Sequence, residues 1–389
     1  MVSKSILEKH FIKEDIKHLE EWLEKAKELA NSISTKSQES GVKSIFTIST
    51  TTKVSNKHYP YLTPIRKIIH GFIGGSVVFS QTQAYILSKH IDGIVDLILV
   101  DAEKKIGITL GVDKNALEHF ALEFPHENVQ SRVHVEMGNL SASCAMVIEK
   151  SQFHEYKPND MTVEAVWHFL SYHFKILSGK KIAIIGGGNI GFKLALKLVE
   201  SGSNIELVRR DMGRGTLMTD VIDIAKPKST IAIAHYNPDP LQASLFSDAI
   251  IGCTNGAPVI TWKMIQSMKP DGIVIDVGKG SVFKDAVQQS IKHNIPIFRS
   301  DISSAIDGVI STIQRNKQII EKEIGRREIK KNIFIVSGGQ LGEDGDLVVD
   351  NYVQPRQIFG IANGMGDLKQ NLSKKDKENI KKMKGFIIE

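Results

Sequence analysis

The stretch from residue 181 to residue 208 constrains the fold of this chain more than any other. It opens with Lys-Ile-Ala-Ile-Ile, a mostly apolar run that predicts a strand buried in a parallel sheet. Gly186, Gly188 and Gly191 follow in the G-x-G-x-x-G spacing, and apolar residues then recur with a helical period to about residue 200. After a glycine–serine break, Ile-Glu-Leu-Val at 205–208 predicts a second strand. The stretch therefore predicts a strand–turn–helix–strand unit.

Glycines in this spacing suit the binding of a dinucleotide. They allow a tight turn, close approach of the backbone to a diphosphate, and close packing of the helix on the strand. The helix N-terminus adds N–H groups and the positive end of a dipole, which hold the anion. We therefore expect cofactor contacts from Gly186, Gly188, Asn189, Ile190 and Gly191. The alternative is a βαβ unit whose glycines serve packing alone.

The residues after the second strand indicate which dinucleotide is bound. NAD-binding units place an acidic residue about 20 positions past the glycines, where it accepts hydrogen bonds from the adenosine ribose. Arg209 and Arg210 stand there instead, and two guanidinium groups can bind a 2′-phosphate. NADP(H) is therefore the expected cofactor. Asp211 keeps NAD(H) open, and the two arginines could also be a solvated pair at a strand end.

Length and composition fit a two-domain protein with ordinary cores. The chain has 389 residues, of which 41% are hydrophobic and 24% are charged. No long apolar run predicts a membrane span, and the N-terminus lacks the apolar segment of a signal peptide. The two cysteines, Cys144 and Cys253, have no metal-ligand spacing. These features predict a cytoplasmic protein with no bound metal and no membrane partner.

Charge gives no indication of a nucleic-acid partner. The formal net charge is +6, and much of it lies in the lysine-rich tail, which has the rhythm of a solvated helix. Nucleic-acid binding would require a basic stripe with aromatic residues or a known recognition module, and neither is visible. A small-molecule substrate is the expected partner, and the chain could form a homodimer.

The first 155 residues predict an α/β domain without a phosphate-binding loop. An amphipathic helix is expected at 13–31 and a strand at 44–49. A β-α-β pattern follows with strands at 76–80 and 95–100, and two further candidate strands lie at 133–137 and 145–149. Asp101 comes just past the end of a strand, where open α/β sheets bind ligands.

Residues 156–325 predict the second α/β domain, a doubly wound parallel sheet of the Rossmann type. A helix at about 161–176 links the domains. Beyond the glycine-rich unit, further strands are expected at 230–234, 248–252, 272–277 and 295–298, with helices between them. A long helix is expected at 303–325. Residues 326–389 form an extension with strands at 333–336 and 347–350, for which a subunit contact and a lid are both open roles.

The second domain resembles a known group of cofactor domains. That group includes shikimate dehydrogenase, methylenetetrahydrofolate dehydrogenase and the A subunit of dipicolinate synthase. The similar motifs are Leu-Ser-Gly-Lys-Lys-Ile-Ala-Ile-Ile-Gly-Gly-Gly-Asn-Ile-Gly at 177–191, Ser-Asp-Ala-Ile-Ile-Gly-Cys-Thr at 247–254, and Ile-Val-Ile-Asp-Val-Gly at 273–278. The resemblance implies that Thr254 and Asn255 lie beside the ribose or nicotinamide and Gly278 beside the nicotinamide ring. It also aligns Arg210 with the arginine that binds the 2′-phosphate in shikimate dehydrogenases.

The same resemblance, weaker in the first domain, suggests catalytic residues. Leu-Thr-Pro-Ile-Arg-Lys at 62–67 keeps the threonine-to-lysine spacing of the shikimate dehydrogenase lysine motif, and Asn159-Asp160 approximates the aspartate motif. Lys67 and Asp160 are therefore the expected proton-handling pair, with Asp101 as a second candidate carboxylate. A surface lysine and a helix cap are the simpler interpretations. His58, His134 and Lys279 are weaker candidates for acid–base or substrate contacts.

Together these patterns predict an NADP(H)-dependent oxidoreductase. Its substrate would be a small polar, anionic metabolite such as a keto, imino or hydroxy acid. The alternative is a protein that binds NAD(P) without catalysis and regulates a partner.

Overall fold

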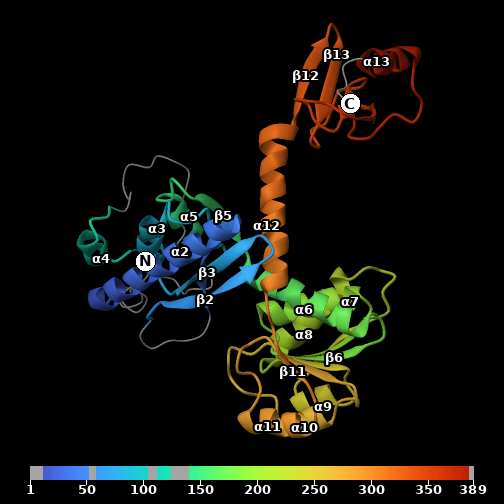
Figure 1. The fold of residues 1–389 in the computed structure, drawn as a ribbon. Coiled ribbons are helices and arrows are strands. Elements are labelled where there is room, and N and C mark those ends of the chain that lie inside the picture. Colours follow the sequence, from blue (N-terminus) through green and yellow to red (C-terminus); the bar gives the residue numbers. More distant parts are fainter. Residues whose placement is uncertain (1–11, 52–57, 104–111, 124–139, 385–389) are drawn as a thin grey trace, which may run out of the picture. The chain divides into compact units, whose positions relative to one another are not determined.

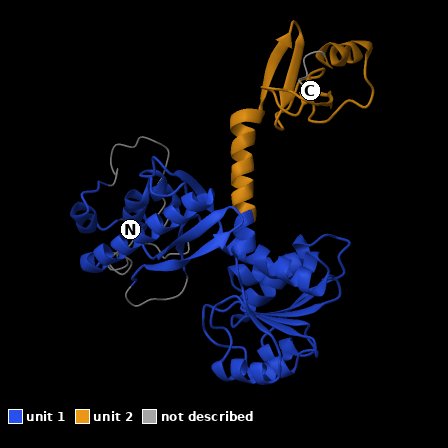
Figure 2. Ribbon diagram, viewed as in Figure 1, with its two compact units in different colours: residues 1–307 blue, residues 308–389 orange. Residues whose placement is uncertain are grey.

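The computed structural model describes residues 12–51, 58–103, 112–123 and 140–384 of the chain. The chain divides into two compact units, residues 1–307 and 308–389 (Figure 2). The first unit contains two sheets, here called sheet A and sheet B, and the second contains a smaller one (Figure 1). None of the helices in the described part has the length and apolar character needed to cross a membrane.

Sheet A has five strands in the order β2-β3-β1-β4-β5, and all neighbouring pairs except β2–β3 are parallel. Its strands are β1 (Lys43–Thr50), β2 (Tyr61–Ile68), β3 (Gly71–Val78), β4 (Leu97–Asp101) and β5 (Gln152–Tyr156). Its helices are α2 (Ile16–Ser40), α3 (Gln81–Ile91), α4 (Lys114–His119) and α5 (Leu140–Ala145). The core forms mainly between the apolar stripe of α2, the buried helix α3 and one face of the sheet.

Sheet B has six parallel strands in the order β11-β10-β9-β6-β7-β8. The strands are β6 (Lys181–Ile185), β7 (Asn204–Val208), β8 (Ala234–Asn237), β9 (Ala249–Gly252), β10 (Ile273–Asp276) and β11 (Ile297–Arg299). The helices are α6 (Pro158–Phe174), α7 (Asn189–Glu200), α8 (Met212–Ala225), α9 (Pro240–Ser244), α10 (Trp262–Gln266) and α11 (Lys284–Lys292). Numbered within the sheet, this is the 3-2-1-4-5-6 order of the Rossmann fold. The predicted fold class is therefore confirmed.

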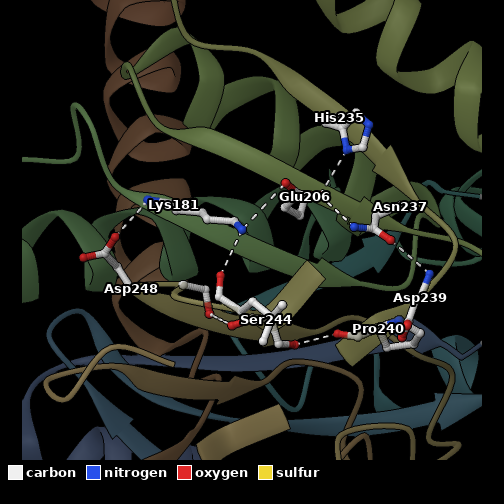
Figure 3. A network of polar contacts seen from close by, with 10 residues as sticks. Lys181, Glu206, His235, Asn237, Asp239, Pro240, Ser244 and Asp248 are labelled. Carbon is white, nitrogen blue, oxygen red and sulfur yellow. Dashed lines mark hydrogen bonds and ion pairs between the residues drawn. The ribbon is translucent and has the colours of Figure 1, made fainter. Parts of the chain in front are cut away.

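The two faces of sheet B have separate cores because successive side chains of a strand point to opposite sides. Ile182 and Ile184 of β6 pack with α6, α7 and α8, whereas Ala183 and Ile185 pack with α10 and α11 on the other face. Near the β8 edge, that second face also carries a polar network on β6, β7 and β8 (Figure 3). There Glu206 lies 3.8 Å from the Lys181 ammonium and 3.1 Å from a ring nitrogen of His235.

The second unit begins within α12 (Ser303–Gln318), which continues as a π-helical turn, η1 (Ile319–Glu323). A four-stranded sheet in the order β12-β13-β14-β15 follows, and α13 (Lys374–Lys384) packs on it through Met383. The strands are β12 (Gly325–Lys330), β13 (Ile333–Ser337), β14 (Leu347–Val349) and β15 (Ile358–Ile361). This sheet has a core of its own.

Several local predictions differ from the structure. The apolar run at 145–149 is the end of α5 and a turn, because Val147 and Ile148 donate backbone hydrogen bonds to Cys144 and continue the helix instead of pairing with a strand. The strand expected at 230–234 begins only at Ala234, where pairing with β7 starts. Strands β2, β5, β12 and β15 were not predicted at all; in β2 a proline and a bulge between Thr63 and Arg66 interrupt the alternation. The predicted strand at 133–137, with His134, lies outside the described residues.

Candidate functional site

The glycine-rich turn sits where the strand order of sheet B reverses. Strand β6 neighbours both β7 and β9, so the connections that leave β6 and β9 diverge, and open α/β sheets bind ligands in the crevice between them. Gly186 follows β6 with φ +118°, and a Cβ there would lie 2.7 Å from the Cys253 carbonyl after β9. A Cβ on Gly191 would lie 2.1 Å from the Gly186 oxygen. The turn therefore requires glycine at both positions.

Gly188 is different, because its missing side chain leaves open space. A Cβ there would meet no heavy atom within 4 Å. Gly188 is also the N-cap of α7, so no side chain accepts hydrogen bonds from the N–H groups of the first turn, where Asn189, Ile190 and Gly191 stand. Free N–H groups at a helix N-terminus next to open space suit a diphosphate. The predicted loop thus has the geometry that cofactor binding needs.

At the end of β7, Arg209 and Arg210 carry guanidinium groups, whereas the Asp211 carboxylate is occupied by contacts with Arg214. Arg209 donates a hydrogen bond to the Gly187 carbonyl, and its Nε is buried without a partner among the described residues. Arg210 is exposed. Asp211 caps α8, accepting from the Arg214 backbone N–H at 3.0 Å, and its other oxygen lies 3.7 Å from the Arg214 Nε. A phosphate at this position would satisfy the orphaned Nε of Arg209, so the residues present fit NADP(H).

The loops after β9 and β10 form the next part of the site. A Cβ on Gly278 would lie 1.9 Å from the Thr254 carbonyl, so the two loops touch and only glycine fits. The Thr254 hydroxyl donates to the Ala257 carbonyl at 2.7 Å and lies 3.0 Å from the Ser281 hydroxyl. Asp276 accepts from the backbone N–H groups of the turn after it. These contacts fix the residues that the resemblance places beside the ribose and nicotinamide.

One cavity of about 530 Å³ joins these loops to the carboxyl ends of the strands of sheet A. On the cofactor side it is lined by Gly188, Asn189, Ile190, Cys253, Thr254, Asn255, Gly278 and Lys279. On the side of sheet A its lining combines the hydroxyl-bearing residues Thr47, Ser49, Thr50, Thr51, Tyr61, Thr63 and Tyr156 with Pro64, Arg66, Ile68, Ile73, Gly74 and Val77. Its lining among the described residues includes the cations Arg66, Lys279 and Arg299 and no aspartate or glutamate.

Sheet A has its own point of reversal, and this point opens onto the same cavity. Among its parallel strands, β3 and β4 lie on opposite sides of β1. Thr50 ends β1 and lines the cavity, while Asp101 ends β4 and accepts from the Thr50 backbone N–H at 3.1 Å and from its hydroxyl at 2.8 Å. Asp101 is only 2% exposed and does not line the cavity, so its link to the cavity is the pair of hydrogen bonds from Thr50.

The other two predicted catalytic residues are not among the residues that line the cavity. Lys67 is exposed on β2, whereas its neighbour Arg66 lines the cavity and forms an ion pair with Asp301 at 3.2 Å. Asp160, in the first turn of α6, forms ion pairs with Lys193 and with Lys157. Burial alone would raise the pKa of Asp160, but these two ammonium groups hold it below its usual range. Asp160 is therefore ionised at neutral pH and holds α6 against α7.

Of the weaker candidates among the described residues, Lys279 lines the cavity and His58 does not. Lys279 lines the cavity, with a left-handed backbone at φ +55°. His58 is not among the lining residues; its carbonyl accepts a hydrogen bond from Gln83. Cys253 lines the cavity, but burial, helped by nearby Asp276, raises the pKa of its thiol to about 12, so it is not a thiolate. Within the described ranges no cluster of three metal-ligating side chains occurs.

Sequence reasoning missed Tyr156 and Arg299, and it chose Lys67 over its neighbour Arg66 as the catalytic candidate. Tyr156 ends β5 beside Asp101 and is 6% exposed, yet it lines the cavity. Burial, with the nearby Asp101 carboxylate, raises its pKa, so the phenol stays neutral and can donate a hydrogen bond. The available signal was position, because all three residues lie in or at the ends of strands that reach the cavity. For Arg66 and Tyr156 that signal could not be used, because β2 and β5 were absent from the predicted sheet, whereas Arg299 directly follows the strand predicted at 295–298.

No protein-family model matches the sequence, and no curated protein sequence matches it either. Solved structures with similar folds include the A chain of dipicolinate synthase from Bacillus subtilis, at 12% identity over 72% of this chain and 98% of that one, with a TM-score of 0.32. A shikimate dehydrogenase in complex with NADP+ matches at 16% identity over 40% of this chain and 54% of that one, with a TM-score of 0.29. An ornithine carbamoyltransferase from Gloeobacter violaceus matches at 13% identity over 67% of this chain and 84% of that one, with a TM-score of 0.32.

The chain covers only about half the length of that shikimate dehydrogenase, and nearly all of the dipicolinate synthase subunit. Both proteins belong to the group whose cofactor domain the sequence resembles. The assignment of the Rossmann fold rests on the strand order of sheet B itself.

Proposed function

We propose that this protein is an NADP(H)-dependent oxidoreductase that acts on a small polar, anionic metabolite, such as a keto, imino or hydroxy acid. The observation that carries the proposal is the shared cavity. The cavity lies at the points where the strand order of each sheet reverses. The glycine-rich loop of sheet B lines one side, and strand ends of sheet A with several hydroxyl groups line the other. Such crevices are where α/β sheets bind their ligands.

The cofactor would be held by the residues predicted for it. The turn at Gly188 and the N-terminus of α7 would bind the diphosphate, and Arg209 and Arg210 the 2′-phosphate. Thr254, Asn255 and Gly278 would then flank the ribose and nicotinamide. When bound, the nicotinamide supplies or accepts a hydride, and the protein positions the substrate and handles a proton.

The substrate side favours an anion. Arg66, Lys279 and Arg299 are the only charged side chains among the described lining residues. A carboxylate there would gain charge-assisted hydrogen bonds, while the hydroxyl groups of sheet A would bind its polar substituents. For the proton, Asp101 behind Thr50 and the neutral phenol of Tyr156 are better placed than Lys67 or Asp160, which do not line the cavity.

The test has two stages. In the first stage, binding of NADPH and NADH is measured by nucleotide fluorescence. In the second, a panel of keto, imino and hydroxy acids is screened for a change in the absorbance of the reduced nicotinamide at about 340 nm. Saturable NADPH binding with turnover of an anionic substrate supports the proposal. Binding without turnover of any panel member would favour a non-catalytic NAD(P)-sensing protein. Absence of binding at high micromolar cofactor would exclude both.

A further inference from the structure

Hydrogen-bond donors without acceptors gather at the corner where β11 leads into α12. Arg299 ends β11 and lines the cavity, and its guanidinium group has no acceptor among the described residues. The next residue, Ser300, also lines the cavity, and its Oγ is buried without a hydrogen-bond partner in the described part of the chain. A buried hydroxyl without a partner is costly, so native proteins usually satisfy it with water or a ligand. This corner therefore has the donors of a binding site.

The first turn of α12 adds backbone donors. Ile302 precedes the helix, and its side chain has no acceptor atom with which to cap the N–H groups. The Ser303 N–H donates to the Asp301 carboxylate at 2.9 Å, whereas those of Ser304 and Ala305 have no acceptor within the described ranges. Ile302 and Ser303 both line the cavity, so this helix end borders it. Free N–H groups at the start of a helix of 16 residues attract anions.

Arg66 brings a second guanidinium group to this corner. One of its terminal nitrogens donates to the Asp301 carboxylate at 3.2 Å, and its other N–H groups have no acceptor among the residues that the structure describes. Hydrogen bonds from Ser303 hold the pKa of Asp301 below its usual value, and the charges of Arg66 and Arg299 act in the same direction, so both arginines lie near this carboxylate. Asp301 itself does not line the cavity. The two arginines therefore keep a net positive charge beside the cavity.

We propose that this corner binds a phosphate group, and that the substrate of the proposed oxidoreductase is a small phosphorylated keto or hydroxy compound. A carboxylate offers about four lone-pair sites, fewer than two guanidinium groups, a hydroxyl and two backbone N–H groups can fill. A phosphate group offers three strong acceptor oxygens and a charge of about −1.5 to −2 at neutral pH. That charge balances Arg66, Arg299 and Lys279, three cations of the lining, less the one negative charge of Asp301.

This corner is separate from the groups expected to hold the phosphates of the cofactor. Gly188 and the start of α7 follow β6, and Arg209 and Arg210 follow β7. Strand β11 is at the opposite edge of sheet B, with β10 and β9 between it and β6. A phosphate group at the start of α12 therefore belongs to the substrate and not to NADP(H). The reaction of that substrate rests on the proposed function, whereas binding of phosphate can be measured without it.

The test uses inorganic phosphate as the probe. It is titrated by calorimetry into the full chain in the presence of excess NADPH, which occupies the cofactor phosphate sites. We expect saturable binding with a dissociation constant at or below about 1 mM. Arg299→Gln should weaken this binding at least about tenfold, the effect of losing one charge-assisted hydrogen bond. Arg356→Gln, at an exposed arginine of the second unit, is the matched control and should leave it unchanged. Acetate, the carboxylate probe, should bind at least about tenfold more weakly than phosphate.

Ser300→Ala separates ligand binding from a structural role. Removal of a buried hydroxyl that has no partner should leave Tm unchanged or raise it, while phosphate binding weakens about threefold or more. No saturable binding of phosphate, acetate binding as tight as that of phosphate, or phosphate binding that neither Arg299→Gln nor Ser300→Ala weakens would each overturn the proposal.

The two proposals of this work fail in different ways. NADPH binding with turnover of an unphosphorylated acid, by a protein that does not bind phosphate, would overturn the phosphate site and leave the oxidoreductase. Phosphate binding that Arg299→Gln abolishes, by a protein that does not bind NADPH, would support the site and remove the oxidoreductase.

Discussion

The three residues after β7 differ sharply in what they can offer a cofactor. Asp211 already caps α8 and pairs with Arg214, so its carboxylate is engaged. Arg209 has a buried Nε without an acceptor among the described residues, which is costly unless a ligand satisfies it. An engaged carboxylate and a guanidinium Nε that lacks an acceptor are the two features on which the proposed preference for a phosphorylated ribose depends.

The first prediction follows from this contrast. Arg209→Ser should weaken NADPH binding by about 10- to 100-fold, the worth of a charge-assisted hydrogen bond, and change NADH binding by less than about threefold. Both dissociation constants are measured by fluorescence titration. Arg356→Ser, at an exposed arginine in the second unit, is the control and should change neither. Equal losses for both nucleotides would show that Arg209 does not read the 2′-phosphate.

The second prediction separates two glycines of the same turn. Gly191→Ala places a methyl group 2.1 Å from the Gly186 oxygen and should destabilise the fold by about 2 kcal/mol or more. Gly188→Ala meets no heavy atom within 4 Å. Its stability should stay within about 0.5 kcal/mol of the parent, while NADPH binding weakens at least about tenfold as the methyl group enters the phosphate space. Urea denaturation and nucleotide titration measure the two effects, and normal NADPH binding by Gly188→Ala would place the diphosphate elsewhere.

At the scale of single elements, helix α8 owes its position on β8 to one glycine. A Cβ on Gly215 would lie 2.3 Å from the Tyr236 ring, so the helix approaches the strand over a bare backbone. Gly213, two residues earlier, is exposed, and a Cβ there would make only an ordinary contact at 3.7 Å. The same helix therefore offers a matched pair of substitutions.

The third prediction uses that pair. Gly215→Ala should destabilise the protein by about 1–3 kcal/mol because the helix must move away from the ring. Gly213→Ala should be neutral or stabilise it by up to about 1 kcal/mol through helix propensity. Thermal and urea denaturation compare the two variants. A stable Gly215→Ala protein would mean that the aromatic ring can rotate away at little cost.

Helix α3 begins in a buried polar cluster that includes an acidic residue. The carboxylate of Glu14 accepts from the Ser80 hydroxyl at 2.5 Å and from the Gln83 amide at 2.9 Å. Burial, with a smaller contribution from Asp113, raises the pKa of Glu14 above its usual value, although the two hydrogen bonds oppose the shift. A raised carboxyl pKa means that the folded state binds the proton more tightly than the unfolded state.

The fourth prediction is the resulting pH dependence. Protonated Glu14 contributes its full stabilisation at pH values below the pKa it has in the unfolded chain, near 4.5. This stabilisation is lost as the pH rises through the higher pKa of the folded state. Glu14→Gln should therefore raise Tm by roughly 2 °C or more at pH 7–8 and have little effect near pH 4. Glu21→Gln, at an exposed position of α2, is the control and should be silent at both. A Glu14→Gln protein that is less stable at pH 8 would show that the ionised form is favoured.

At the scale of the whole molecule, the site exists because residues of both sheets line one cavity. Adjacent side chains of β2 differ in this respect, since Arg66 lines the cavity and Lys67 does not. Arg66 donates a hydrogen bond to the Asp301 carboxylate and the His70 N–H donates one to the Asp307 carboxylate, which links β2 to the segment that leaves sheet B. Contacts between residues far apart in sequence therefore hold Arg66 at the cavity.

The fifth prediction compares these neighbours on the first substrate found by the screen. Arg66→Gln should raise KM by about 10- to 100-fold, the loss expected for one charge-assisted contact to an anion. Lys67→Gln should change kcat and KM by less than about threefold. Steady-state kinetics on the two purified variants measure both constants. The reverse pattern would restore Lys67 as the functional residue.

Sequence alone determined what is local. The glycine-rich turn was predictable because its strand, turn and helix are contiguous, and nearby backbone atoms, such as the Gly186 oxygen that faces Gly191, require glycine at Gly186 and Gly191. The parallel order of sheet B follows from the same alternation of strands and helices. Even the choice between Arg209 and Asp211 needed the structure only to show which group is engaged.

Tertiary structure decided the rest of the cavity lining. Thr50, Arg66, Tyr156 and Arg299 come from β1, β2, β5 and β11, and no sequence spacing relates them. These side chains meet only because β2 and β5 belong to sheet A. Neither strand was predicted, and in β2 a proline and a bulge interrupt the alternation. These side chains come together only after strands from separate parts of the chain have paired. Sequence spacing reports which residues are close along the chain, so it cannot show which residues are close in the folded cavity.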